Sequence, residues 1–199
     1  MTEPTPHRTW TALAPCRWGW ALITGDADGV RTVWLVDDAD TAHRAARRDD
    51  TFLGDTAKGP VTLTDSAPAV TIRPHPEASE GRPPTALLTA ILAALDDPVT
   101  AHLQPLPLAP IGTPFQQRVW AALRAIPAGQ TVSYGALAHT LGLPHGARAV
   151  ARACAANPLA VLIPCHRVVA AHGRLTGYRW GLERKRALLA TEAAATHGG

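Results

Sequence analysis

The chain has 199 residues, 46% of them hydrophobic and 18% charged, which is enough to bury the core of one domain or of two small ones. No apolar run approaches the roughly 20 residues of a membrane span, and the N-terminus lacks the basic and apolar segments of a signal peptide, so we expect no membrane partner. The formal net charge is +3, and three cysteines without an export signal argue against a disulfide framework and favour the cytoplasm.

The N-terminal part is predicted to be rich in β-structure, with strands over 18–23, 30–36, 61–63 and 70–72. The Gly and Asp residues at 25–29 are typical of a turn between the first two strands. Helices are expected over 41–48 and over 85–95, the second capped by Thr85, and the Pro-rich segment 73–84 is expected to be a loop.

A second Pro-rich stretch, 104–110, is the natural linker in this chain. We therefore predict a β-rich domain over 1–100, a linker over 101–112 and a mainly helical domain over 113–199. The fold class that follows is α+β.

Sharp helix signals follow this linker. Thr113 at the N-cap, Pro114 at the first helical position and Gln116 two residues later form a capping box. Apolar residues then recur at helical spacing as far as Ile126, and residues 127–129 should end the helix.

Two short helices with a glycine-containing turn predict a helix-turn-helix. Ser133 can cap the first, over 134–141, and the second runs from about 147 to 156, where the following Asn-Pro pair should end it. On the second helix, one face has the i, i+3, i+4 and i+7 spacing of core residues: Ala147, Val150, Ala151 and Cys154. Another face carries Arg148, Arg152 and Ala155.

The charge of the chain is distributed unevenly. Residues 113–192 carry ten Lys and Arg but two acidic residues, a net charge of +8, whereas residues 1–112 carry nine basic and fourteen acidic residues, a net charge of −5. A basic C-terminal half suits a polyanion such as nucleic acid, although a solvated basic face would explain the charge equally well.

A cysteine followed directly by a histidine closes the apolar run 159–163, which we expect to be a strand ending at Pro164. Cys165 would then stand at the rim of the sheet as a thiol that His166 could activate. Taken alone, this pair fits a packed, inert cysteine better than a nucleophile.

Together these segments resemble the O6-alkylguanine-DNA alkyltransferases, the methylated-DNA–protein-cysteine methyltransferase family. The resemblance runs from Gly112 to Glu192 and rests on several blocks in order: Gly112-Thr113-Pro114-Phe115-Gln116, Val119-Trp120, Ile126-Pro127-Ala128-Gly129, Ser133-Tyr134, Arg148-Ala149-Val150, Asn157-Pro158, Ile163-Pro164-Cys165-His166-Arg167-Val168, Gly177-Tyr178-Arg179, and Lys185 with Leu188-Leu189. It implies a small β-rich, ribonuclease-H-like N-terminal domain beside a helical domain with a helix-turn-helix.

The resemblance also implies the chemistry. Cys165 would take the alkyl group from guanine O6, His166 would act as its base through a bridging water, and Glu192 would orient the histidine. Each molecule would then repair one base and be consumed. The possible repair of O4-alkylthymine stays open.

By the same resemblance, the partner would be double-stranded DNA that contains O6-alkylguanine, bound through the minor groove with the damaged base flipped out. Arg148 would fill the gap in the base stack, and Tyr134 would crowd the phosphate of the target nucleotide. The complete DNA-binding set predicted is Ser133, Tyr134, Ala147, Arg148, Ala151 and Arg152. We expect a monomer, with cooperative binding left open.

The predicted base pocket consists of Asn157, Val168, Tyr178 and Arg179. Tyr178 would donate toward guanine O6 or N3, backbone groups near Val168 would read the base, and Asn157 would brace the turn before Cys165. Some relatives carry a serine where this chain has Arg179, so no hydroxyl contact is transferred to that position.

We expect no cofactor and no metal. A four-cysteine zinc module is excluded because Cys16 is the only cysteine before the linker, although a mixed site of Cys16 with His7, His43 or His75 stays open. Two other functions compete with repair: a damage-binding protein that lacks transfer, against which the presence of Cys165 argues, and a cysteine hydrolase, which leaves Arg148 and Tyr134 unexplained.

Overall fold

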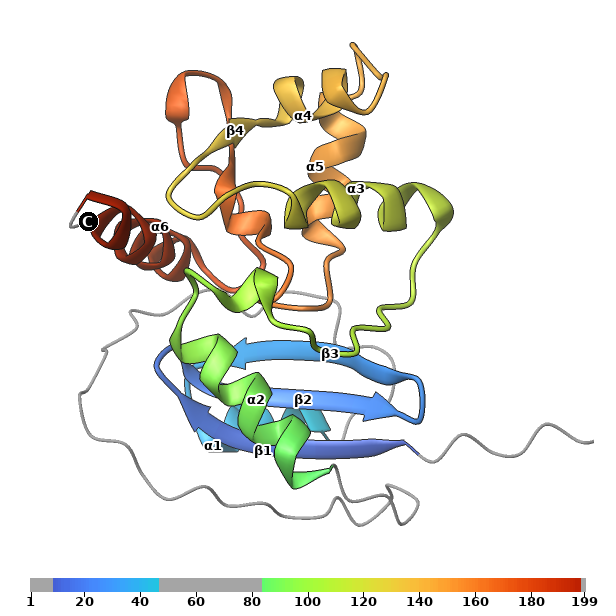
Figure 1. The fold of residues 1–199 in the computed structure, drawn as a ribbon, viewed down its shortest axis with the longest axis vertical. Helices are drawn as coiled ribbons and strands as arrows, with labels where there is room; N and C mark the ends of the chain where they lie inside the picture. The colour runs from blue at the N-terminus through green and yellow to red at the C-terminus, as the bar shows by residue number, and fades with distance from the viewer. Residues whose placement is uncertain (1–8, 47–83, 198–199) are drawn as a thin grey trace, which may run out of the picture.

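The computed structural model describes residues 9–46 and 84–197, which form a small sheet and a larger, mainly helical part stacked on it (Figure 1). The elements follow in the order β1 (Trp10–Cys16), β2 (Gly19–Asp26), β3 (Gly29–Val36), α1 (Ala39–Ala46), α2 (Thr85–Asp96), η1 (Ala101–Leu103), α3 (Pro114–Arg124), β4 (Val132–Ser133), α4 (Tyr134–Thr140), α5 (Ala147–Ala155), η2 (Cys165–Arg167), β5 (Val168–Val169), η3 (Ala171–Gly173) and α6 (Leu182–His197), where η marks a 3-10 turn. The α+β prediction is confirmed.

The N-terminal sheet is an antiparallel meander, β1-β2-β3. The two predicted strands in this region and the tight turn between them are confirmed, whereas β1 was not anticipated, because its Pro15 and alanines weaken the strand signal. One face of the sheet packs against α2, and the other carries a small apolar cluster: Leu13, Leu22 and Val36 with Trp20 and Trp34 beside them.

The two predicted N-terminal helices are present as α1 and α2, but the predicted cap of the second is wrong. Thr85 is the first residue of α2, and Pro84 precedes it without a side-chain cap. Pro84 at the N-cap has φ −55° and ψ 124°, and its side chain has no oxygen that could accept a hydrogen bond from the first turn of α2. The predicted strands over 61–63 and 70–72 and the loop over 73–83 lie outside the described residues.

The Pro-rich stretch predicted as a linker is bonded to the sheet. The amide of Val30 donates to the carbonyl of Pro107 at 2.7 Å, and the amide of Ala109 donates to the carbonyl of Val30 at 2.9 Å. A parallel bridge therefore joins Val30 to Leu108 at the edge of β3. The division of the chain at 101–112 stays a prediction, but this segment is attached to the N-terminal sheet.

The helical part begins as its sequence signals predict. The Thr113 hydroxyl accepts from the Gln116 amide at 3.3 Å, and the Gln116 side chain accepts from the Thr113 amide at 2.7 Å, which completes the capping box of α3. The Ser133 hydroxyl accepts from the Ala136 amide at 3.0 Å and so caps α4. Helices α4 and α5 pack together as the predicted helix-turn-helix.

The predicted strand over 159–163 is wrong. Leu159 makes one parallel bridge to Val33, after which the chain turns, with the Ile163 amide donating to the Leu159 carbonyl at 3.1 Å. Val161 adopts a φ of 65°, a left-handed conformation that is rare for a β-branched residue. All five residues are buried, so the apolar run reports burial in the core rather than β-structure.

A two-residue parallel pairing completes the frame of the site. Val132 pairs with Val168 and Ser133 pairs with Val169, so β4 and β5 tie the start of α4 to the segment that follows Cys165. Within the described residues, 9–46 and 84–197, no helix combines the length and apolarity needed to cross a membrane.

Candidate active site

Cys165 is the first residue of the 3-10 turn η2, and its sulfur is contacted by the side chain of an asparagine. Its amide donates to the Ile163 carbonyl at 2.8 Å. The Asn157 amide nitrogen lies 2.9 Å from the Ile163 carbonyl oxygen and 3.3 Å from Cys165 Sγ. The Asn157 side-chain oxygen in turn accepts from the Leu159 amide at 2.9 Å. Asn157 thus braces the turn and lies behind the thiol.

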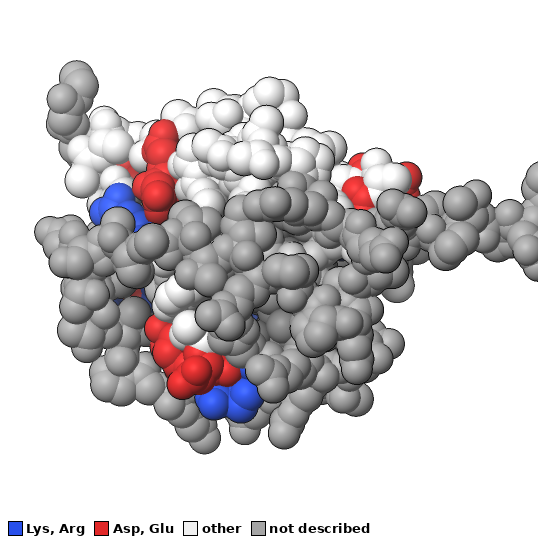
Figure 2. Space-filling model, turned by 90° about the horizontal axis from the view of Figure 1, so that it is seen from below, with Lys and Arg blue, Asp and Glu red and all other residues white. Residues whose placement is uncertain are grey.

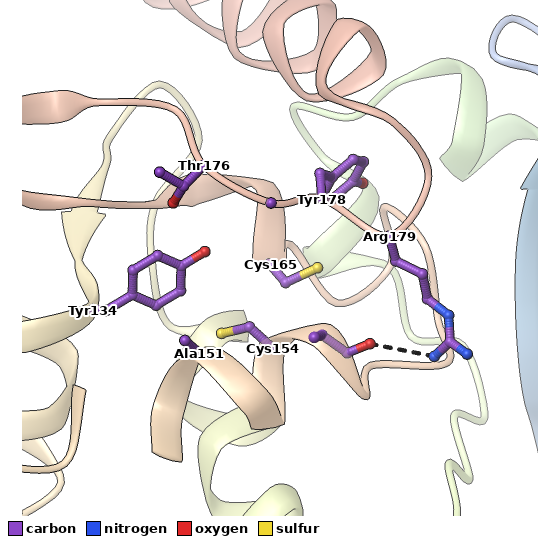
Figure 3. A pocket seen from close by; sticks show the side chains of 9 residues that line it. Tyr134, Ala151, Cys154, Cys165, Thr176, Tyr178 and Arg179 are labelled. Atoms are coloured by element: carbon purple, nitrogen blue, oxygen red, sulfur yellow. Dashed lines mark hydrogen bonds between the residues drawn. The ribbon is translucent and has the colours of Figure 1, made fainter. Parts of the chain in front are cut away.

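The thiol faces a cavity of about 430 Å³ between α5 and the segment 176–179 (Figure 3). Its walls are formed by Tyr134, Ala151, Cys154, Ala155, Cys165, Thr176, Gly177, Tyr178 and Arg179. This brings together predicted residues from four separate stretches of the sequence. Val168, predicted to read the base, does not line the cavity: its side chain is buried.

Cys165 itself is 5% exposed. Burial raises the pKa of its thiol to about 11, and the hydrogen bond from Asn157 and the positive charges of Lys185 and Arg179 offset only part of that rise. At neutral pH the group is therefore a thiol in the free protein. A nucleophilic role needs a base that takes its proton.

His166 and Glu192 form a fully buried pair. His166 Nε2 lies 2.8 Å from Glu192 Oε1. Burial lowers the pKa of His166 and outweighs the opposing effect of Glu192, so the imidazole is neutral. An ionised carboxylate can only accept hydrogen bonds. The imidazole hydrogen therefore lies on Nε2, and Nδ1 is left as a hydrogen-bond acceptor. This buried Nδ1 has no hydrogen-bond partner among the residues that the structure describes.

Arg167 is the residue whose importance sequence reasoning missed. Its guanidinium is fully buried and contacts Glu192 Oε1 at 2.9 Å through Nη2, with Nε 3.1 Å from both carboxylate oxygens. Its remaining donors reach the carbonyls of Ile126 and Pro98 and the ring of His102. An arginine beside a histidine in sequence carries no signal of burial, so only the fold reveals this role.

Glu192 is consequently a well-bound carboxylate. Burial alone would raise its pKa, but the hydrogen bonds from His166 and Arg167 outweigh burial and lower the pKa to about 2. The Gly129 amide also donates to Oε2 at 3.2 Å. Glu192 therefore keeps its negative charge at every pH where the protein would act.

Lys185 is a second buried cation, which the sequence analysis named only among the residues of the resemblance. Its Nζ donates to the carbonyl of Val168 at 2.6 Å and to that of Thr176 at 3.2 Å. Burial lowers the pKa of Lys185. The ammonium thus joins the two segments that flank the cavity and places a positive charge near Cys165.

Two tyrosines carry hydroxyl groups to the cavity. Tyr178 is buried, and within residues 9–46 and 84–197 its hydroxyl has no hydrogen-bond partner. Its ring meets the His166 ring edge-on, with centroids 6.5 Å apart. Tyr134, at the start of α4, lies on the opposite side of the cavity (Figure 3). Burial raises the pKa of both phenols, so both remain hydrogen-bond donors.

The outer face of α5 is exposed as predicted. Arg148 and Arg152 are both exposed, whereas Ala147 and Ala151 are half-buried and Ala151 lines the cavity. Ala153, one residue outside the predicted core spacing, is buried against the core. The helix therefore presents its arginines to solvent and its small residues to the cavity.

Cys154, which has core spacing in the sequence, is buried. It also lines the cavity with Cys165, and burial raises the pKa of its thiol further. Among the residues described, no cluster of three or more His, Cys, Asp and Glu could hold a metal. His7 and His75 of the open mixed site lie outside that part of the chain.

Comparisons with known proteins agree with this geometry. Residues 114–194 match the family model described as 6-O-methylguanine DNA methyltransferase, DNA binding domain. The bifunctional transcriptional activator/DNA repair enzyme Ada of Escherichia coli K12 is 42% identical over 183 residues, which cover 92% of this chain and 45% of Ada. A methylated-DNA–protein-cysteine methyltransferase of Mycobacterium tuberculosis H37Rv is 58% identical over 81 residues, 41% of this chain and 49% of that protein.

Solved structures match over nearly the whole chain. The crystal structure of Mycobacterium tuberculosis O6-methylguanine methyltransferase has a TM-score of 0.60 and 31% identity, covering 94% of this chain and 93% of that one. The structure of Mycobacterium tuberculosis OGT in complex with DNA has a TM-score of 0.63 and 29% identity, over 92% and 91% of the two chains. The chain spans half or less of the length of the curated relatives it matches first. On the strength of these likenesses, the chain belongs to the O6-methylguanine-DNA methyltransferase family.

Proposed function

We propose that this protein repairs O6-alkylguanine in double-stranded DNA by transferring the alkyl group to Cys165, once per molecule. The observation that carries the proposal is the placement of the Cys165 thiol on the wall of a cavity of about 430 Å³, in front of the buried His166–Glu192 pair. The cavity opens beside α5, whose arginines are exposed. A nucleophile, its base and a basic helix therefore meet in one place.

Activation of the thiol follows from the protonation states. The Cys165 proton leaves through a bridging water to His166 Nδ1, the nitrogen that Glu192 keeps free by accepting the hydrogen of Nε2. The imidazolium that forms is stabilised by the Glu192 carboxylate. Lys185 and Arg179 favour the thiolate through their positive charges, against the burial that raises its pKa.

Transfer then needs no cofactor. The thiolate sulfur attacks the alkyl carbon on O6, the carbon–oxygen bond breaks, and its electron pair passes to the guanine. The Tyr178 hydroxyl, which lines the cavity, would donate a hydrogen bond toward O6 or N3 and so stabilise the negative charge left on guanine. The guanine then takes up one proton, which balances the proton that Cys165 gave to His166. The thioether on Cys165 does not hydrolyse, so the protein is consumed.

The base must leave the duplex before this reaction, since O6 cannot be reached inside the stack. Helix α5 would enter the minor groove, with Arg148 filling the gap, while the half-buried Ala147 and Ala151 allow close approach. Tyr134, and Ser133 at the N-terminus of α4, would meet the backbone of the target strand. Figure 2 shows the face of the molecule seen from below, away from α4 and α5, where described acidic side chains lie in small groups, two of them with Lys or Arg beside them.

Intact-protein mass spectrometry after incubation with a duplex that carries one O6-methylguanine tests the proposal. We expect one methyl group in place of one hydrogen, located on Cys165 by peptide mapping and saturating at one per protein. Cys165→Ala should lose the mass gain and keep DNA binding, while Cys154→Ala, in the same cavity, should keep both. A duplex with O4-methylthymine in the same assay tests the second substrate.

Other outcomes identify the competing functions. Tight binding to the lesion without any mass gain would show a damage-binding protein. Repeated turnover without a stable adduct would indicate a cysteine hydrolase.

A further inference from the structure

Arg179 connects three segments that are distant in sequence. Its Nη1 donates to the carbonyl of Ala155 at 3.3 Å, and its guanidinium carbon lies 4.7 Å from the ring centroid of Trp34. It directly follows Tyr178 in the chain. One side chain therefore links the pocket segment 176–179, the end of α5 and the strand β3 of the N-terminal sheet.

The bond to Ala155 spans the cavity wall. Ala155 is the last residue of α5, and the carbonyls of a last turn have no partner within their helix and carry partial negative charge. A guanidinium donor is favoured there. Both Ala155 and Arg179 line the cavity, so this hydrogen bond joins its α5 wall to its Tyr178 wall, as the dashed line in Figure 3 shows.

Trp34 supplies the fixed support. It lies on the face of the sheet opposite α2, next to the small cluster of Leu13, Leu22 and Val36. Its neighbour Val33 is bonded to the stretch that precedes Cys165, donating to the Pro158 carbonyl at 2.8 Å and accepting from the Ala160 amide at 3.0 Å. The guanidinium of Arg179 lies over the Trp34 ring at cation–π distance, where an ammonium would present a point charge.

We propose that Arg179, held between Ala155 and Trp34, is a positioning residue that fixes the cavity wall and the orientation of Tyr178, and so makes the N-terminal sheet part of the active site. The inference rests on the proposed transfer to Cys165. We call this arrangement the Arg179 clamp. Some relatives carry a serine at this position, and the clamp gives a role to the arginine that this chain has there.

The clamp has an electrostatic consequence at the thiol. The ionisable groups around Cys165 are His166, Lys185 and Arg179 together with Tyr134, Cys154 and Tyr178. Burial raises the thiol pKa, and Arg179 is one of the two side-chain cations that oppose that rise. Loss of the guanidinium should therefore move the thiol pKa upward.

The clamp is tested by measuring the single-turnover rate of methyl transfer at saturating DNA, together with the dissociation constant for the same duplex. Arg179→Met and Trp34→Leu should each slow transfer about tenfold, the order expected from losing one partly buried cation–π contact. The dissociation constant should change less than about twofold. The double variant should be no slower than the slower single variant, since both changes remove one interaction.

Conservative and matched variants separate positioning from general damage. Trp34→Phe keeps an aromatic ring under the guanidinium and should recover most of the rate, whereas Arg179→Lys keeps the charge but not the planar group and should recover only part of it. Trp20→Leu, beside the same small cluster as Trp34, and Arg186→Met, an exposed arginine on α6, should react like the unchanged protein. Thermal unfolding of each variant shows whether it is folded.

A second measurement does not depend on DNA. The pH dependence of Cys165 alkylation by iodoacetamide should shift to higher pH in Arg179→Met and stay unchanged in Arg186→Met. The clamp would be overturned by unchanged transfer rates in folded Arg179→Met and Trp34→Leu. It would also be overturned by a double variant whose loss of rate equals the product of the two single losses. Absence of methyl transfer in the unchanged protein would instead refute the proposed function, and the iodoacetamide profile would still decide whether Arg179 acts on the thiol.

Discussion

The charged groups behind Cys165 and those on the outer face of α5 are arranged in opposite ways. Glu192, Arg167 and Lys185 are fully buried and bonded within the protein, whereas Arg148 and Arg152 are exposed. A buried charge is tolerated only when it is paired, and pairing fixes its position. The exposed arginines keep their freedom to meet phosphates and bases. We propose that proton transfer relies on the buried cluster, and that DNA contact relies on the exposed face.

Glu192→Gln should have the largest effect on this contrast, because it neutralises the centre of the buried cluster and leaves the Arg167 guanidinium without its anion. We expect a loss of about 3 kcal/mol in the free energy of unfolding and a marked slowing of methyl transfer. Chemical denaturation and single-turnover kinetics measure the two effects. Glu183→Gln, an exposed glutamate on the same helix, is the control.

The same carboxylate predicts how stability depends on pH. The pKa of Glu192 is lowered from 4.5 to about 2 in the folded protein, so its contribution is complete above the unfolded value and is lost as the pH falls from about 5 towards 2. The unchanged protein should lose stability more steeply than Glu192→Gln in this range. Parallel slopes for the two proteins would contradict a buried, ionised Glu192.

Arg148→Ala should have an intermediate effect, confined to duplex substrates. Extruding a base costs a few kcal/mol, and a side chain that fills the gap offsets part of that cost, so repair of the duplex should slow by about tenfold or more. Reaction with free O6-benzylguanine needs no flipping and should be unchanged. Equal losses on both substrates would remove Arg148 from this role and associate it with the buried chemistry instead.

Arg152→Ala should have the smallest effect. Arg152 lies one helical turn after Arg148 on the same face of α5 and would contact a DNA phosphate. Its loss should therefore weaken DNA binding about equally for all DNA sequences. The slope of log binding constant against log salt concentration should fall by roughly one. Fluorescence anisotropy over a salt series measures this slope. An unchanged slope would place Arg152 outside the DNA interface.

In the helical part, local signals in the sequence were sufficient to predict the helix caps and the exposed face of α5. The capping box at Thr113, the Ser133 cap and the exposed arginines of α5 all depend on residues within one or two turns of each other, and the structure contains each of them. The spaced blocks of the resemblance likewise identified the family. By contrast, the strand predicted over 159–163 failed, because an apolar run records burial and does not distinguish a strand from a buried turn.

The sequence alone was enough to predict the candidate nucleophile, its neighbouring histidine and the helix-turn-helix, since each is encoded by adjacent residues. The tertiary structure alone decided that Arg167 and Lys185 are buried, that Pro107 bonds to Val30, and that Arg179 lies over the ring of Trp34. These contacts join residues far apart in the chain, and their partners are chosen by the packing of the sheet against the helical part. A pattern read along one segment carries no information about which distant carbonyl, carboxylate or ring a side chain will meet.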